Sequence, residues 1–168
     1  MADKIPVVTL AELKAAVGKE APEVVSPPIS ASDIRKFAIA VYWPETPPRL
    51  FWDEEYARQT KWGGIVAPQE FNPFAWPIRG PGWVPFPFGF MRGARAFNGG
   101  SAAEYGVPMR PGDVITATQR IAEVSERRGR SGPLIFEISE SVWRNQRGEI
   151  VKKMRGTQVH VLPEGGLQ

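Results

Sequence analysis

Cysteine is missing from this chain of 168 residues, and histidine occurs only once, as His160. Without cysteine there is no disulfide bond, no thiolate metal ligand and no cysteine nucleophile, and a reducing cytoplasm is the simplest compartment. A single imidazole also excludes a histidine-rich metal site and any mechanism that uses two histidines of one chain. We therefore expect neither a metal nor a resident cofactor.

Long apolar runs are also missing. The first twenty residues carry charges throughout, unlike a signal peptide or a membrane span. The net charge is only +3, and no nucleic-acid-binding motif accompanies the basic residues. The length suits one domain with its own core. We expect a single cytoplasmic domain over residues 1–168 that binds neither membrane nor nucleic acid.

The first half of the chain has helical patterns. Residues 8–19 have apolar positions at helical spacing behind Thr9, a plausible N-cap with Glu12 three residues on. A second helix begins after Ser30 or Ser32 and ends near Trp43, because the prolines that follow cannot continue it. Residues 53–60 predict a third helix. Residues 69–74 predict a brief fourth helix inside a loop rich in proline and aromatic residues that extends to residue 89.

The last third of the chain predicts strands. Residues 114–124, 134–143 and 150–161 are strand-like, and an earlier strand is expected around residues 91–98. Residues 125–132 are expected to form a charged loop, and residues 145–148 carry a hairpin signal. Helices followed by a meander of antiparallel strands indicate an α+β fold.

Three stretches in this order resemble the MaoC-like dehydratase family. Residues 30–71 read SASDIRKFAIAVYWPETPPRLFWDEEYARQTKWGGIVAPQEF, residues 106–113 read GVPMRPGD, and the last stretch is the hairpin NQRGE. The resemblance covers roughly residues 20–162. It implies a hot-dog fold, which is a curved antiparallel sheet around a central helix, usually dimerised. It also implies acyl thioesters of coenzyme A or acyl carrier protein as substrates.

The usual catalytic pair of that family is not matched. Catalytic members of the family use an aspartate and a histidine five residues apart to hydrate enoyl thioesters or dehydrate (R)-3-hydroxyacyl thioesters. Alignment of the family's D-x-x-x-A helix with Asp53–Ala57 places the histidine position on Phe51 and the aspartate position on Thr46. Phenylalanine cannot transfer a proton. The resemblance then implies the N-terminal, substrate-binding half of a heteromeric hydratase, whose partner is a second, catalytic hot-dog subunit.

Two alternatives remain beside this one. One is a homodimer or larger homo-oligomer that binds acyl thioesters without chemistry, and the other is a thioesterase that uses a carboxylate. Candidate catalytic residues are Glu45, Asp53, Glu70 and His160. His160 with one of these three carboxylates would be the only acid/base set that contains an imidazole, although a strand histidine of this kind is also typical of a core.

Aromatic and glycine residues are the candidate binding residues. Large apolar area with little rotamer entropy suits Phe51, Phe71, Trp76 and Trp83 for an acyl pocket. The segment Asn98, Gly99 and Gly100 either lets a thioester approach the backbone closely or forms a β-bulge. A group of basic residues is either solvated surface or a contact for coenzyme A phosphates or a carrier protein: Arg127, Arg128, Arg130, Lys152, Lys153 and Arg155.

Overall fold

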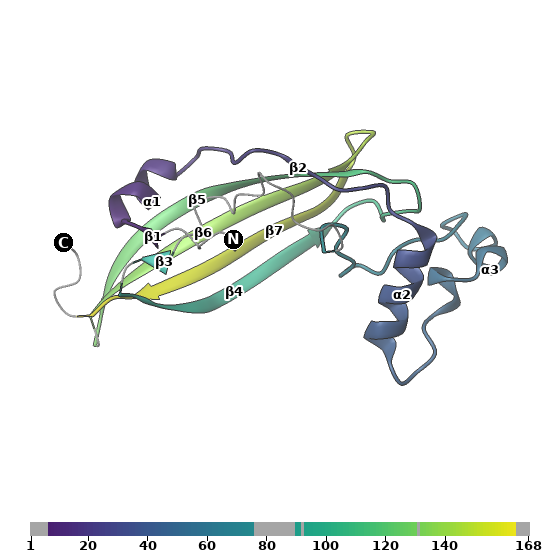
Figure 1. The fold of residues 1–168 in the computed structure, drawn as a ribbon, viewed down its shortest axis with the longest axis horizontal. Helices are drawn as coiled ribbons and strands as arrows, with labels where there is room; N and C mark the ends of the chain where they lie inside the picture. The colour runs from purple at the N-terminus through teal and green to yellow at the C-terminus, as the bar shows by residue number, and fades with distance from the viewer. Residues whose placement is uncertain (1–6, 76–89, 92, 131, 164–168) are drawn as a thin grey trace, which may run out of the picture.

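The computed structural model describes residues 7–75, 90–91, 93–130 and 132–163. Its main element is an antiparallel sheet of five strands in the order β2-β5-β6-β7-β4. Figure 1 shows that the long strands of this sheet twist along their common length. The strands are β2 (Val24–Val25), β4 (Arg95–Tyr105), β5 (Ile115–Gly129), β6 (Gly132–Asn145) and β7 (Ile150–Val161).

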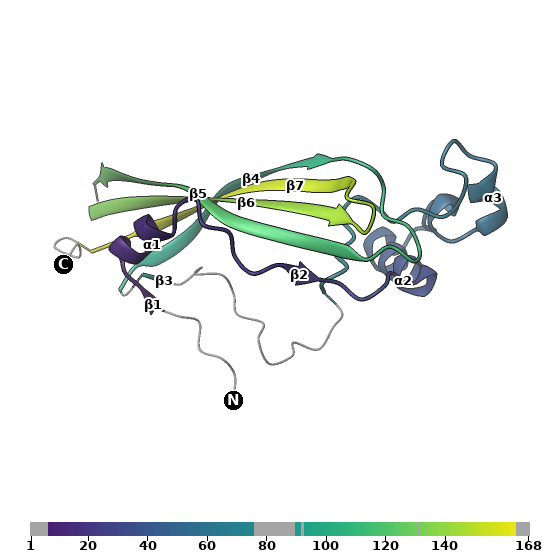
Figure 2. The same cartoon turned by 90° about the horizontal axis from the view of Figure 1, so that it is seen from above.

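The N-terminal elements cover one end of this sheet. β1 (Val7–Val8) pairs in parallel with β3 (Phe90–Met91), and α1 (Leu10–Ala16) packs on β5. Thr9 and Glu12 form the predicted capping box of α1, with the Glu12 backbone N–H 3.2 Å from Thr9 Oγ1 and the Thr9 backbone N–H 2.7 Å from Glu12 Oε2. Figures 1 and 2 show these elements together at the same end of the sheet.

The other helical elements lie beyond the opposite end of the sheet (Figures 1 and 2). They are α2 (Ala31–Tyr42), the 3-10 helix η1 (Arg49–Phe51) and α3 (Glu54–Arg58). Ser30 caps α2 and Asp53 caps α3, each by accepting a backbone N–H three residues on. The three predicted helices in residues 8–60 are therefore confirmed.

The buried residues form two apolar clusters, one at each end of the sheet. One cluster lies between the sheet, α2 and the loop that follows α3; its members are Ile29, Ile34, Ala57, Ile65, Ala67, Phe71, Met109, Ile115, Trp143 and Val151. The second lies under α1 and β1; its members are Val8, Leu13, Met91, Ile121, Ile135 and Leu162. This division leaves each end of the sheet with its own core.

The predicted helix over residues 69–74 is wrong, because these residues form turns. Pro73 cannot supply a backbone N–H, and the Asn72 side chain accepts a hydrogen bond from the Phe74 N–H at 3.0 Å, which replaces a helical partner. Phe71 and Phe74 pack edge-on against different rings, those of Phe37 and Trp143. The rest of the predicted proline- and aromatic-rich loop, residues 76–89, lies outside the described residues.

The predicted loop over residues 125–132 is also wrong. β5 continues to Gly129 and pairs there with Gly132 of β6. Glu126, Arg127 and Arg128 therefore belong to β5, where the Arg127 guanidinium lies 5.0 Å over the Phe136 ring, and Arg130 lies in the turn that follows. Arg127 and Lys152 lie on non-adjacent strands near opposite ends of the sheet, so the basic residues do not form one cluster.

The remaining strand predictions are confirmed with changed bounds. Of the strand expected at 91–98, Met91 belongs to β3 and residues 95–98 begin β4, which continues to Tyr105. The hairpin between β6 and β7 turns at Gly148 with φ of 78°. None of the described helices is long and apolar enough to cross a membrane.

Candidate functional site

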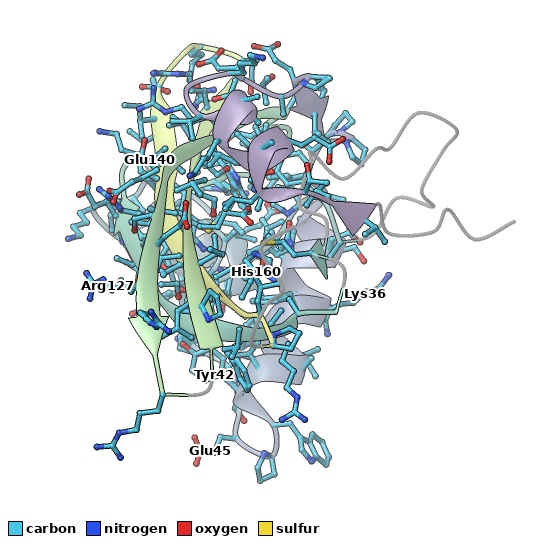
Figure 3. All side chains as sticks on the ribbon, turned by 90° about the vertical axis from the view of Figure 1, so that its left-hand side faces the viewer. Lys36, Tyr42, Glu45, Arg127, Glu140 and His160 are labelled. Atoms are coloured by element: carbon cyan, nitrogen blue, oxygen red, sulfur yellow. The ribbon has the colours of Figure 1, made fainter. Side chains whose placement is uncertain are left out.

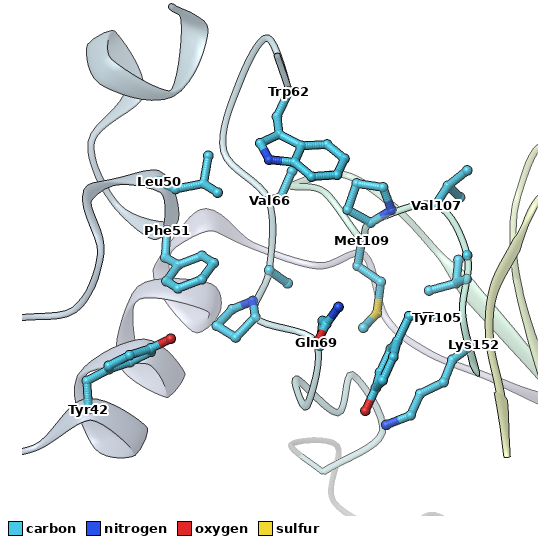
Figure 4. A pocket seen from close by; sticks show the side chains of 15 residues that line it. Tyr42, Leu50, Phe51, Trp62, Val66, Gln69, Tyr105, Val107, Met109 and Lys152 are labelled. Carbon is cyan, nitrogen blue, oxygen red and sulfur yellow. The ribbon is translucent and has the colours of Figure 1, made fainter. Parts of the chain in front are cut away.

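A cavity of about 280 Å³ lies where α2, η1 and the loop after α3 meet the ends of β4 and β7. Figure 4 shows Tyr42, Leu50 and Phe51 on one side of this cavity, and Tyr105 and Lys152 on the other. The lining residues are Tyr42, Leu50, Phe51, Trp62, Val66, Ala67, Pro68, Gln69, Tyr105, Gly106, Val107, Pro108, Met109, Val151 and Lys152. Most of these side chains are apolar, so the cavity suits an apolar ligand.

Phe51 reaches this cavity from the last residue of η1. Its ring lies 6.0 Å from the ring of Tyr42, at the end of α2, and both rings contribute to the same wall. The η1 turn is closed by the Phe51 N–H, which donates to the Pro48 carbonyl at 3.1 Å. The predicted binding residue Phe51 is therefore part of an apolar wall.

Asp53 supports the turn that presents Phe51. Its carboxylate accepts the Tyr56 backbone N–H at 3.0 Å and two guanidinium N–H groups of Arg49 at 2.7 and 2.9 Å. The Tyr56 N–H hydrogen bond, together with Arg49, lowers the pKa of Asp53 from its usual 3.8. This carboxylate is occupied in joining η1 to α3 and does not line the cavity.

The opposite wall is made by backbone pairing between the end of β4 and the start of β7. The N–H groups of Gly106 and Val107 donate to the Val151 and Ile150 carbonyls, both at 2.9 Å. A Cβ on Gly106 would lie 2.0 Å from the Ile150 oxygen, so only glycine fits at this position of the wall.

Three polar side chains meet at the edge of the cavity. The Lys152 ammonium lies 3.3 Å from Glu70 Oε2 and over the Tyr105 ring at 5.0 Å, and the Tyr105 hydroxyl donates to Glu70 Oε1. The Lys152 side chain is 6% exposed, whereas that of Glu70 is 70% exposed. Glu70, a predicted catalytic candidate, is therefore a rim residue hydrogen-bonded to two residues of the cavity lining.

The only histidine is placed elsewhere. His160 lies eight residues after Lys152 on β7, about 26 Å along the strand. It is fully buried, and its Nε2 is 3.0 Å from Oε2 of Glu137 on β6, which is 1% exposed. Nδ1 of His160 and Oε1 of Glu137 have no hydrogen-bond partner among the described residues. Figure 3 shows His160 within the body of the molecule and Glu45 at its edge.

The predicted acid/base set is thus not assembled. The partner of His160 is Glu137, and none of Glu45, Asp53 and Glu70 is hydrogen-bonded to it. Glu45 is an exposed residue in the turn after α2. Sequence reasoning missed Glu137, because an acidic residue in an alternating strand is normally assigned to solvent.

The other predicted binding residues lie apart from the cavity lining. Phe71 is buried in the core beneath it. Asn98, Gly99 and Gly100 lie on the edge strand β4, where the register with β7 shifts, so the β-bulge interpretation is confirmed. A Cβ on Gly99 would meet Thr157 Cγ2 at 2.9 Å. Trp76 and Trp83 lie outside the described residues.

The sequence matches the profile of the FAS1-like dehydratase domain region over residues 15–154. The chain belongs to this family. Together with its structural neighbours, this match confirms the predicted relationship to MaoC-like dehydratases. No curated protein matches the chain by sequence.

Several solved structures share the fold. A chain of the ChsH1-ChsH2 complex from Mycobacterium tuberculosis superposes with a TM-score of 0.70 at 20% sequence identity, covering 92% of this chain and 95% of that one. The MaoC-like dehydratase from Rhodospirillum rubrum gives a TM-score of 0.58 at 21% identity, covering 94% and 98%. A chain of the truncated HadBC complex, a 3R-hydroxyacyl-ACP dehydratase from M. tuberculosis, gives 0.54 at 19% identity, covering 82% and 95%. The predicted α+β hot-dog class is confirmed.

Proposed function

We propose that this FAS1-like dehydratase region is the substrate-binding subunit of a heteromeric enoyl-thioester hydratase or (R)-3-hydroxyacyl-thioester dehydratase. A second hot-dog subunit supplies the catalytic aspartate and histidine. The substrate is an acyl thioester of coenzyme A or acyl carrier protein. The observation that carries the proposal is the apolar wall at Phe51, where the family resemblance places a proton-transferring histidine.

The chemistry of hydration explains why a partner is needed. Adding water to an enoyl thioester requires a base that takes a proton from water and an acid that returns one. His160 cannot serve at this cavity, because it is fully buried and outside the lining. Phe51 and Tyr42 instead offer apolar area to an acyl chain. Two of the structural neighbours, the ChsH1-ChsH2 and HadBC complexes, are assemblies of two different chains by their names, which supports a heteromer.

Hydration of a short enoyl-CoA, followed by the loss of its ultraviolet absorbance, tests the proposal. The purified chain alone should show negligible turnover, and a hot-dog subunit that bears the aspartate and histidine should restore it. A Phe51→Ala variant in the complex should raise KM more than it lowers kcat, because it changes the wall and not the proton-transfer groups. Robust turnover by the chain alone would overturn the proposal.

The Glu70 cluster favours a second candidate, a thioesterase. Glu70 is a carboxylate at the rim of the cavity, hydrogen-bonded to Tyr105 and Lys152, and a carboxylate can activate water for attack on a thioester. Release of free thiol from a panel of acyl-CoA substrates separates this candidate from the first. Glu70→Gln should abolish thiol release, whereas Glu45→Gln, an exposed carboxylate outside the cavity lining, should retain it.

A further inference from the structure

Lys152 is a buried cation in the wall of a cavity that is otherwise uncharged. Its side chain is 6% exposed, and among the described lining residues no other side chain is charged. Removing an ammonium group from water is costly unless hydrogen bonds and an opposite charge replace the lost hydration. A lysine at this position therefore needs an anionic partner.

The partner that the chain itself offers is a weak one. Glu70 is 70% exposed and lies 3.3 Å from Nζ, so solvent screens most of this attraction. Glu70 is also the only described residue that accepts a hydrogen bond from Nζ, and an ammonium has three N–H donors. The rings of Tyr105 and Trp143, at 5.0 and 5.4 Å, stabilise the positive charge without accepting those hydrogen bonds. The ammonium thus keeps donor capacity for a ligand.

We infer that Lys152 selects acyl groups that carry a carboxylate. The carboxylate takes the place of Glu70 at Nζ, and the apolar part of the acyl group contacts the wall formed by Leu50 and Phe51. Figure 4 shows that wall across the cavity from Lys152 and Tyr105. This inference rests on the proposed function and adds the substrate class to it.

A phosphate of coenzyme A is the other possible source of an oxygen anion. Proteins usually bind phosphate with arginine forks or with several cations. The described lining contains no arginine and one lysine, which matches the single charge of a carboxylate better.

Isothermal titration of the full chain with two coenzyme A thioesters of equal length tests the inference. One thioester carries hexanoate, and the other carries hexanedioate with its free carboxylate. The wild-type chain should bind the carboxylated thioester at least about tenfold more tightly. Lys152→Met keeps the length and apolar stem of the side chain but lacks the charge. The two thioesters should therefore bind to this variant with equal affinity. Lys153→Met, a change at the exposed neighbour on the same strand, should leave the preference of the wild type unchanged.

A Glu70→Gln variant keeps the test valid if Lys152→Met does not fold. Loss of the competing Glu70 carboxylate should increase the preference for the carboxylated thioester over the uncarboxylated one. A preference that does not increase would contradict the inference. Equal binding of both thioesters by the wild-type chain would overturn the inference but not the proposed function. Binding of neither thioester would contradict both. Weakened binding of free coenzyme A by Lys152→Met would assign the anion to the carrier phosphates and overturn the carboxylate assignment.

Discussion

His160 and Glu137 form a buried polar pair on neighbouring strands. Their facing atoms are 3.0 Å apart, and both side chains are almost completely buried. One polar atom of each residue has no partner among the described residues. A buried pair of this kind contributes little net stability, but the loss of one member leaves the other without a partner in a low-dielectric environment.

We expect Glu137→Leu to lower the free energy of unfolding by about 1–3 kcal/mol, because it leaves the imidazole buried without its hydrogen-bond partner. The double variant Glu137→Leu with His160→Leu should be more stable than the Glu137→Leu single variant, since both polar groups are then removed. Urea unfolding of the variants measures this. Glu140→Leu, which removes a partner of Arg120 at the surface of the same strand, should cost less than about 1 kcal/mol. A double variant that is less stable than the single one would refute this account.

The η1–α3 unit shows how a single carboxylate can join two short elements. Asp53 is the N-cap of α3 and the ion-pair partner of Arg49 in η1, and Phe51 lies between these two residues. Helices of three and five residues have little stability of their own, because nucleation costs more than so few hydrogen bonds return. The position of Phe51 in the cavity therefore depends on Asp53.

This dependence predicts a pH effect. The lowered pKa of Asp53 means that the unfolded chain binds more protons near pH 3.8, so the carboxylate contributes stability above that pH. That contribution should be lost as the pH falls through the lower pKa of the folded state. Asp53→Asn keeps an oxygen for the Tyr56 N–H but lacks the charge. The difference in Tm between the wild type and this variant should have its largest value at about pH 6 and should decrease below pH 3.8.

A Glu55→Gln variant controls for the loss of one negative charge from the same helix. The Tm of Glu55→Gln should fall with decreasing pH in the same way as the Tm of the wild type, because Asp53 is still present. A difference between wild type and Asp53→Asn that does not change with pH would show that the charge of Asp53 is not what stabilises the turn.

At the scale of the whole molecule, the two edges of the sheet differ. The edge of β5 is covered by the N-terminal segment, because the N–H groups of Gly18, Ala21 and Ser26 donate to carbonyls of β5 at 2.8 Å. β4 pairs with β7 on one side, and none of the described strands pairs with its other side. Nearly all residues of β4 are exposed. A long, exposed edge strand is normally paired or protected in native proteins.

We therefore expect the proposed hot-dog partner to cover β4. Hydrogen exchange of backbone amides in residues 95–105 should slow when the partner is added, whereas amides in the centre of β6 should be unaffected because both neighbours are already in place. Mass spectrometry of deuterated peptides measures both segments. Unchanged exchange in β4 within an active complex would place the partner on another surface.

Local patterns in the sequence were sufficient for the elements near the chain's capping residues and prolines. Thr9 with Glu12 and Asp53 determine where α1 and α3 begin, because a side-chain cap acts within three residues. Period-two alternation predicted the long strands, because the alternation of side chains along a strand is also a local property of the chain. Such signals failed at residues 69–74, where packing of Phe71 and Phe74 against separate rings decided the backbone.

The cavity needed the tertiary structure. The sequence by itself determined the class of fold and, through its resemblance to MaoC-like dehydratases, placed Phe51 at the site. Only the folded chain brought Lys152 and Glu70, 82 residues apart, to one rim, and paired His160 with Glu137 across two strands. The physical reason is that the burial of a charged side chain depends on contacts between distant segments, whereas a cap or an alternating strand depends on near neighbours.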